Sequence, residues 1–118
     1  MSRNYYEVLA EAMLERRRIL EDWRRVVEEL ARIVRRVYPE ARVYVTGSVA
    51  RGEWIAASDL DVVIVLPREP SPREAAEVIS LVWERLGLPP SHPLEIHVVG
   101  PKSFERYKRG ALQPLDKP

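Results

Sequence analysis

The first third of the chain has the hydrophobic period of an α-helix. From Asn4 to Tyr38 it contains neither proline nor glycine, and Ala, Glu, Leu, Arg and Val dominate. The apolar residues follow one another mostly at spacings of three and four: Leu9, Met13, Leu20, Trp23, Val27, Leu30, Val34 and Val37. We therefore predict an amphipathic helical segment over residues 1–38, with one narrow apolar stripe.

A straight helix over this segment is longer than a domain of this size is wide. About 33 residues at ~1.5 Å each span ~50 Å. Either the helix breaks near Arg16–Arg18 and folds back, or its first half projects from the domain. The stripe from Leu9 to Trp23 on a projecting helix needs a partner, so we expect an association surface there, in a homodimer or with a helical protein.

After Pro39 the pattern changes to short elements separated by prolines and glycines. The alternation of polar and apolar residues in Arg42–Thr46 predicts a half-buried strand. Leu60–Leu66 is an apolar run interrupted only by Asp61, which is typical of a buried central strand. Leu94–Val99 predicts a third strand.

The helix expected between the second and third strands has clear boundary signals. Ser71 is a candidate N-cap, Pro72 stands at the first helical position, and Glu74 completes a capping box. Gly87 is placed to end the helix.

The end of the chain predicts a short closing helix, capped by Ser103 and reaching Arg109, and then a frayed tail over residues 110–118. The element order is thus helix, strand, strand, helix, strand, helix. It predicts a small α/β (α+β) fold, with a mixed sheet of at least three strands, flanking helices and a long N-terminal helix.

Length and composition limit the class of protein further. The 118 residues fit a single domain over 1–118, with its catalytic core at 42–99. A net charge of +1, from 19 basic and 18 acidic residues, argues against nucleic-acid binding by bulk electrostatics and leaves open binding by a local basic patch. The sequence shows no membrane-spanning run and no signal-peptide pattern, so we expect a cytoplasmic location. The absence of cysteine excludes disulfides, thiolate zinc sites and cysteine nucleophiles.

Candidate chemistry begins where the first predicted strand ends. Gly47 directly follows Thr46, and a glycine there lets the backbone approach a ligand closely. Ser48 can cap the next turn while backbone N–H groups face an anion. Ordinary turn chemistry explains the same residues, so this feature is weak by itself.

Two acids stand at the start of the second predicted strand. Residues two apart on a strand point to one face, so Asp59 and Asp61 present two carboxylates side by side. A charge inside an apolar run is costly unless it is paired or bound to a metal, and clustered carboxylates suit Mg²⁺. The alternative is that Asp59 caps a turn and Asp61 lies at a solvated strand end.

A third acid, Glu95, interrupts the third predicted strand. Beside the other two carboxylates it would complete a divalent-metal cage; as an edge residue it would face solvent instead. His97, two residues further on, lies on the same face as Glu95. We expect the His97 imidazole to be packed or hydrogen-bonded beside Glu95 rather than to bind a metal.

Together these features resemble the signature of the polymerase-β-like nucleotidyltransferase superfamily. The matching motif is Gly47-Ser48, ten intervening residues and then Asp59-x-Asp61, with each half next to a strand. The small size and the form of the motif are similar to those of the minimal nucleotidyltransferases. The resemblance covers residues 43–99 and places the family's third acid on Glu95, where aspartate is usual.

The resemblance implies nucleotidyl transfer from a nucleoside triphosphate, with ATP as the expected donor. Asp59, Asp61 and Glu95 would bind two Mg²⁺ ions, and Glu95 could also accept the proton of the attacking hydroxyl. Gly47 would admit the triphosphate and Ser48 would contact it. Arg51 would neutralise phosphate charge. A solvated Arg51 that binds no phosphate explains its position equally well.

The resemblance also implies a partner. Small members of the superfamily typically pair with a helical protein of the HEPN class, as toxin and antitoxin, so adenylylation of such a partner is one expectation. An antibiotic-modifying type of nucleotidyltransferase is an alternative. It would need an acceptor pocket at a homodimer interface, which Trp54 and the Pro89–Pro93 segment could line. A domain that binds nucleotide or a partner without catalysis is another.

Overall fold

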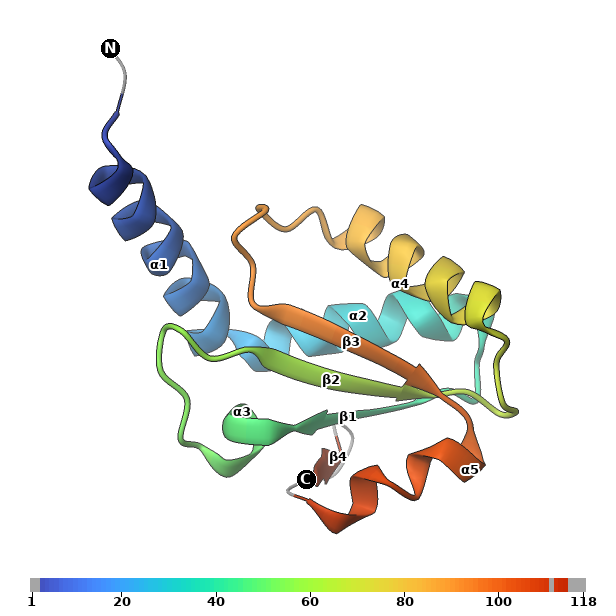
Figure 1. Cartoon of the computed structure of the whole chain (residues 1–118). Helices are drawn as coiled ribbons and strands as arrows, with labels where there is room; N and C mark the ends of the chain where they lie inside the picture. The colour runs from blue at the N-terminus through green and yellow to red at the C-terminus, as the bar shows by residue number, and fades with distance from the viewer. Residues whose placement is uncertain (1–2, 111, 115–118) are drawn as a thin grey trace.

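The computed structural model describes residues 3–110 and 112–114, and it has one four-stranded sheet with helices on both faces (Figure 1). The strands are β1 (Arg42–Thr46), β2 (Leu60–Val65), β3 (Leu94–Val99) and β4 (Leu112–Pro114), in the spatial order β3-β2-β1-β4. β2 and β3 are parallel, whereas β1 pairs antiparallel with both β2 and β4. The predicted α+β fold with a mixed sheet is confirmed.

The helices are α1 (Tyr5–Glu21), α2 (Trp23–Val37), α3 (Gly47–Arg51), α4 (Pro72–Leu86) and α5 (Pro101–Phe104), followed by the 3₁₀ turn η1 (Tyr107–Arg109). α2 and α4 lie on one face of the sheet, while α5 and η1 lie on the other (Figure 1). No helix in the described parts of the chain is long and apolar enough to cross a membrane.

Successive side chains of β2 point to opposite faces of the sheet, so they contact different helices. Leu60, Val62 and Ile64 are fully buried and belong to the main core with α2 and α4. Val63 and Val65 point to the opposite face. Because Asp61 has the same parity as Val63, it also points away from the main core.

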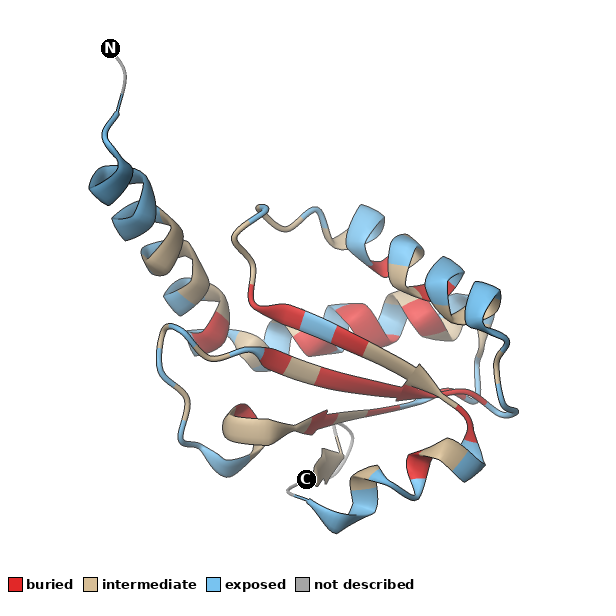
Figure 2. Cartoon of the chain, in the orientation of Figure 1, coloured by how far each residue is buried: buried red, intermediate tan, exposed pale blue. Residues whose placement is uncertain are grey.

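The N-terminal segment forms two helices, with the break at Asp22 and not near Arg16–Arg18. The first half of α1 projects from the domain, and residues 3–11 are exposed (Figures 1 and 2). The expected apolar stripe therefore divides. Leu20 is fully buried and Trp23 packs against the main core, whereas Leu9 is 44% exposed.

The C-terminal region corrects two expectations. Leu112–Pro114 forms β4 against β1, so part of the segment expected to be a frayed tail is a strand; residues 111 and 115–118 lie outside the described residues. Ser103 lies within α5 and does not cap it. Its backbone N–H and hydroxyl donate hydrogen bonds to the carboxylate of Glu69, at 2.8 and 2.9 Å.

The boundaries expected for α4 are confirmed, apart from half of the capping box. The Glu74 N–H donates to Ser71 Oγ at 3.1 Å, and Gly87 ends the helix in the left-handed conformation. The Glu74 carboxylate does not turn back to Ser71. It accepts a hydrogen bond from the Tyr38 hydroxyl at 2.7 Å and pairs with Arg68.

Candidate active site

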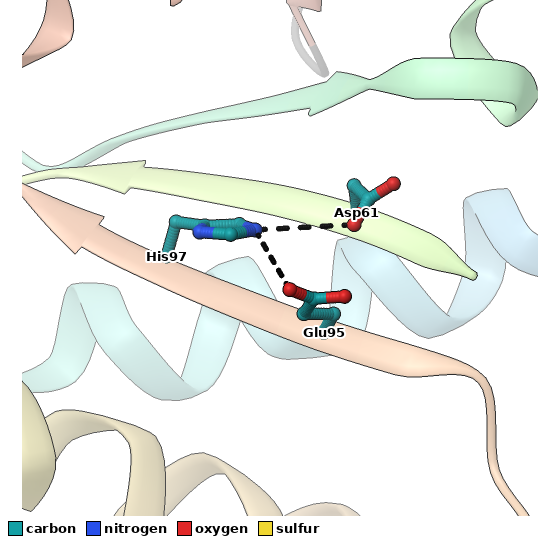
Figure 3. A group of neighbouring side chains, drawn as sticks. All are labelled: Asp61, Glu95 and His97. Atoms are coloured by element: carbon teal, nitrogen blue, oxygen red, sulfur yellow. Dashed lines mark ion pairs between the residues drawn. The ribbon is translucent and has the colours of Figure 1, made fainter.

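The parallel pairing of β2 and β3 brings two acids together. Asp61 lies opposite Glu95 in the register, and both side chains point away from the main core. His97 points the same way, with its Nε2 3.8 Å from Asp61 Oδ1 and 3.5 Å from Glu95 Oε1 (Figure 3). One potential ligand atom from each of the three residues lies within 4.8 Å of the other two.

The Asp61 carboxylate is crowded by negative charge. Its side chain is 25% exposed. Burial raises the pKa of Asp61, the Glu95 and Asp59 carboxylates raise it further, and His97 lowers it. The Asp61 anion is therefore unfavourable without a compensating positive charge, which a proton, a histidinium or a metal cation could supply.

The donor set fits a divalent cation. Carboxylate oxygens are ligands for Mg²⁺ and Mn²⁺, and an imidazole nitrogen extends the range to transition metals. The charge crowding at Asp61 favours a cation at the same place. Asp61, Glu95 and His97 thus form a candidate metal site on geometric and electrostatic grounds.

Gly47 lies directly beside Asp61. Its predecessor Thr46 pairs with Asp61 across the antiparallel β1–β2 ladder. Gly47 has φ 75°, a left-handed conformation that favours glycine, and a Cβ at this position would lie 2.7 Å from Asp61 Oδ2. Both the turn and the approach to the carboxylate therefore require glycine. Ser48 follows in the first turn of α3 and is partly buried.

Asp59 lies outside the group of three. It precedes β2, its side chain is 56% exposed, and its Oδ1 lies 3.4 Å from Nη2 of Arg16. Its charge nevertheless contributes to the raised pKa of Asp61. The structure thus brings Asp61 and Glu95 together and leaves Asp59 at the edge of the site. The metal-binding roles of all three acids stay predictions.

Arg51, expected near phosphate, is exposed in this structure and its Nε pairs with Glu53 at 3.2 Å. Arg16, in contrast, contacts the loops that enter β2 and β3. The sequence indicates Arg16 only as part of a candidate helix break and not as a residue near the site. Most of its partners are backbone carbonyl oxygens. Since every residue type carries such a carbonyl, no pattern in the sequence could have identified this contact.

A hollow of about 720 Å³ lies on the same face of the sheet but is formed at the other end of β2. Tyr44, Val65 and Phe104 are among its lining residues, and neither Asp61 nor Glu95 is. The carboxylates, and not this hollow, mark the candidate active site. Trp54, considered above as a wall of an acceptor pocket, packs against the main core instead.

An α+β sheet that presents paired carboxylates on neighbouring parallel strands defines a class of domain suited to cation-assisted transfer chemistry. The family described as "Nucleotidyltransferase domain" matches residues 27–113, and the chain belongs to this family. The matched region includes the Gly47-Ser48 motif and all three acids. The chain is thus a nucleotidyltransferase domain.

Individual relatives agree with this assignment. The bifunctional uridylyltransferase/uridylyl-removing enzymes of Bordetella pertussis and Bordetella parapertussis are 38% and 36% identical to the chain over 80 residues. These matches cover 63% of this chain but only 9% of each relative, so the chain spans less than a tenth of their length.

A solved structure from Sulfolobus solfataricus, assigned provisionally as a nucleotidyltransferase, superimposes with a TM-score of 0.56. The superposition covers 87% of this chain and 84% of the other, at 24% sequence identity. This likeness supports the fold.

Proposed function

We propose that this chain transfers a nucleoside monophosphate group from a nucleoside triphosphate to a hydroxyl acceptor, with pyrophosphate as the leaving group. The observation that carries the proposal is that Asp61 faces Glu95 across neighbouring parallel strands, in a member of the nucleotidyltransferase domain family. Asp59, Asp61 and Glu95 would hold two Mg²⁺ ions. Such ions, when bound, align the triphosphate and neutralise its charge during displacement at phosphorus.

The two facing acids have different environments, which supports different roles. Glu95 is 53% exposed and can accept a proton from an acceptor hydroxyl that approaches from solvent. Asp61 is more enclosed, and its position within β2 holds its carboxylate in place. His97 lies within 4 Å of both acids, so its charge in the protonated form would offset theirs.

The triphosphate would lie beside Gly47, Ser48 and Arg51. The support is the position of Gly47 against Asp61, together with the family motif described above. Arg51 is free to exchange its exposed Glu53 partner for phosphate, since an exposed ion pair contributes little to stability.

The test measures label transfer from α-labelled ATP with Mg²⁺, and binding of a non-hydrolysable ATP analogue with the same metal. We expect Asp61→Asn to lose transfer by more than ~100-fold, because substitution even of an outer-shell partner of a metal costs ~10–100-fold. Glu95→Gln is expected to lose transfer as well. Glu105→Gln is the matched control, since the same chemical change then falls on an exposed residue that lines the hollow at the other end of this face.

Undiminished transfer by Asp61→Asn would contradict the mechanism. If the wild type binds the analogue but transfers no label to any acceptor tested, the domain that binds nucleotide without catalysis is favoured.

A second candidate concerns the donor base. The curated relatives are named for uridylyl transfer, which favours UTP over the ATP that the minimal nucleotidyltransferases imply. Parallel assays with α-labelled ATP and α-labelled UTP distinguish the two. The nucleotide with the higher kcat/KM is the physiological donor.

For the acceptor, the resemblance to minimal nucleotidyltransferases favours a HEPN-type helical protein, which the chain would adenylylate as its antitoxin. Five apolar side chains of α1 are exposed and available to such a partner or to a second copy of the chain: Tyr5, Tyr6, Val8, Leu9 and Leu14. A small antibiotic-type acceptor is the alternative. Its proposed pocket wall is weakened by the packing of Trp54 against the core.

The association surface is tested by light scattering and by co-expression with any helical protein that an adjacent reading frame encodes. Leu9→Glu is expected to abolish association and leave the fold intact. Val37→Glu is the control, because Val37 is also exposed, at 56%, but ends α2. A monomeric wild type that gains no partner in co-expression contradicts this part of the proposal.

A further inference from the structure

Arg16 of α1 binds the two loops that lead into the acid-bearing strands. Its side chain is only 18% exposed. The guanidinium donates to the carbonyl oxygens of Ala56 (3.1 Å), Ala57 (3.5 Å), Ser58 (2.7 Å), Ser91 (3.2 Å) and His92 (3.5 Å). Its sixth contact is with Asp59 Oδ1, at 3.4 Å. One side chain thus joins two chain segments that are more than thirty residues apart.

The chemistry of arginine suits this arrangement. A guanidinium has five N–H donors in a rigid planar fork, so it can satisfy several carbonyl oxygens that converge from different segments. Without a donor between them, such carbonyl dipoles repel one another. Arg16 therefore stabilises a close approach of the two loops.

The clamped segments end directly at the site. The first hydrogen bond that joins β2 to the chain entering β3 runs from the Leu60 N–H to the Pro93 carbonyl, at 2.8 Å. The next residue pair in the register is Asp61 opposite Glu95. Ser58 and Ser91 are only three and four residues before these acids. A change in loop spacing at Arg16 is therefore transmitted to the two carboxylates.

Neighbouring contacts reinforce the clamp. The Ser91 hydroxyl donates to the Glu15 carboxylate at 2.6 Å, which ties the second loop to α1 again. The first loop is closed on itself by two hydrogen bonds between Ile55 and Ser58, both 2.9 Å. The first loop is thus closed by its own hydrogen bonds, and α1 contacts both loops.

We propose that Arg16 is a positioning residue for the transfer site. It holds the 52–59 and 87–93 loops together, so that Asp61 and Glu95 face each other and Asp59 is oriented beside them. α1 lies outside residues 27–113 that the family matches, so this device adds to the features of the common domain. The inference deepens the proposed function and rests on it for its catalytic consequence.

The first test needs no activity. Hydrogen exchange of the amides of Ser58, Leu60 and His92 is compared in wild type, Arg16→Ala and Arg17→Ala. Arg17 is the matched control, since it is the next residue of α1 and its exposed side chain pairs with Glu21 of the same helix. We expect exchange at these amides to accelerate ~10-fold or more in Arg16→Ala, as befits loss of charge-assisted hydrogen bonds. Arg17→Ala should match the wild type.

The second test measures the site itself with Mn²⁺, a paramagnetic substitute for Mg²⁺. Arg16→Ala should bind Mn²⁺ ~10-fold more weakly than Arg17→Ala and lower kcat of transfer by a similar factor. Added guanidinium ion should restore part of both, whereas the same concentration of sodium chloride should not. Arg16→Lys retains the charge without the fork, and it provides a folded comparison if the alanine variant is unstable.

Two results would overturn the proposal: exchange rates in Arg16→Ala or Arg16→Lys equal to those in Arg17→Ala, or faster loop exchange with unchanged Mn²⁺ affinity and kcat. A wild type that transfers no nucleotide would refute the proposed function instead. In that case loop exchange and Mn²⁺ affinity still decide whether Arg16 positions the acids.

Discussion

The two ends of one sheet face differ in what they contribute to the protein. Towards the end of β2, Val63 and Val65 pack with Phe104 of α5 in a small apolar cluster. At the start of the same strand, Asp61 points to the same face and meets Glu95 and His97. The acidic group and the apolar cluster are thus only two residues apart along β2.

The two ends of this face have opposite effects on the stability of the fold. The apolar end stabilises the fold because it removes hydrocarbon surface from water. The acidic end opposes it, because burial and neighbouring carboxylates raise the pKa of Asp61. Side-chain substitutions in the apolar cluster should therefore lower stability and leave ligand binding unchanged. Side-chain substitutions of the acids should change ligand binding without lowering stability.

The largest expected effect is at the apolar end. Phe104 is 7% exposed and stacks near Tyr44, with ring centroids 4.6 Å apart. Phe104→Ala should lower the free energy of unfolding by about 3 kcal/mol, through lost burial and the cavity it leaves. Urea denaturation measures this, and Phe104→Leu should lose clearly less. Mn²⁺ affinity of the folded variant should stay at the wild-type value; a parallel loss of affinity would show that the two ends are coupled.

An intermediate effect is expected at Gly47, where a matched glycine is available. Gly47 and Gly52 have nearly the same left-handed φ, 75° and 73°, but a Cβ at position 52 would have nothing within 4 Å. Alanine at either position should lower stability by ~1–2 kcal/mol. Only Gly47→Ala should displace the Asp61 carboxylate, and we expect its Mn²⁺ affinity to fall ~10-fold relative to Gly52→Ala. Equal affinities in a calorimetric titration would show that the contact has no role in binding.

The smallest effect concerns stability at Asp61 without metal. Its pKa is raised in the folded state, so the folded protein binds a proton more tightly than the unfolded chain. The stabilisation from this proton is complete below the ordinary carboxyl pKa and is lost as pH rises through the raised folded pKa. Asp61→Asn should remove this dependence and be as stable as the wild type, or more so, at neutral pH.

Thermal melts of both proteins across the acid-to-neutral range, with a chelator present, measure this difference. A marked loss of stability in Asp61→Asn at neutral pH would assign Asp61 a structural role. It would also contradict the division between the two ends of the face.

Much of the fold could be predicted from local patterns in the sequence. Burial along a strand predicted two elements, from the two-residue period of Arg42–Thr46 and from the apolar run after Leu60. Helix capping predicted the ends of α4, at Ser71 and Gly87. β4 could not be predicted in this way. Its three residues have little strand signal, and they form a strand through pairing with the edge of β1.

The candidate site could also be predicted only in part from the sequence. The sequence by itself determined that Asp61 and Glu95 are anomalous charges in apolar strands, because the free energy required to bury a carboxylate depends on its immediate neighbours. Only the tertiary structure decided that Asp59 turns towards Arg16, that His97 lies within reach of both facing acids, and that α1 clamps the loops in front of them. These contacts join segments that are far apart in the chain. They depend on the register of the strands and on the positions of backbone carbonyl groups, and neither of these two features leaves a pattern in the amino-acid sequence.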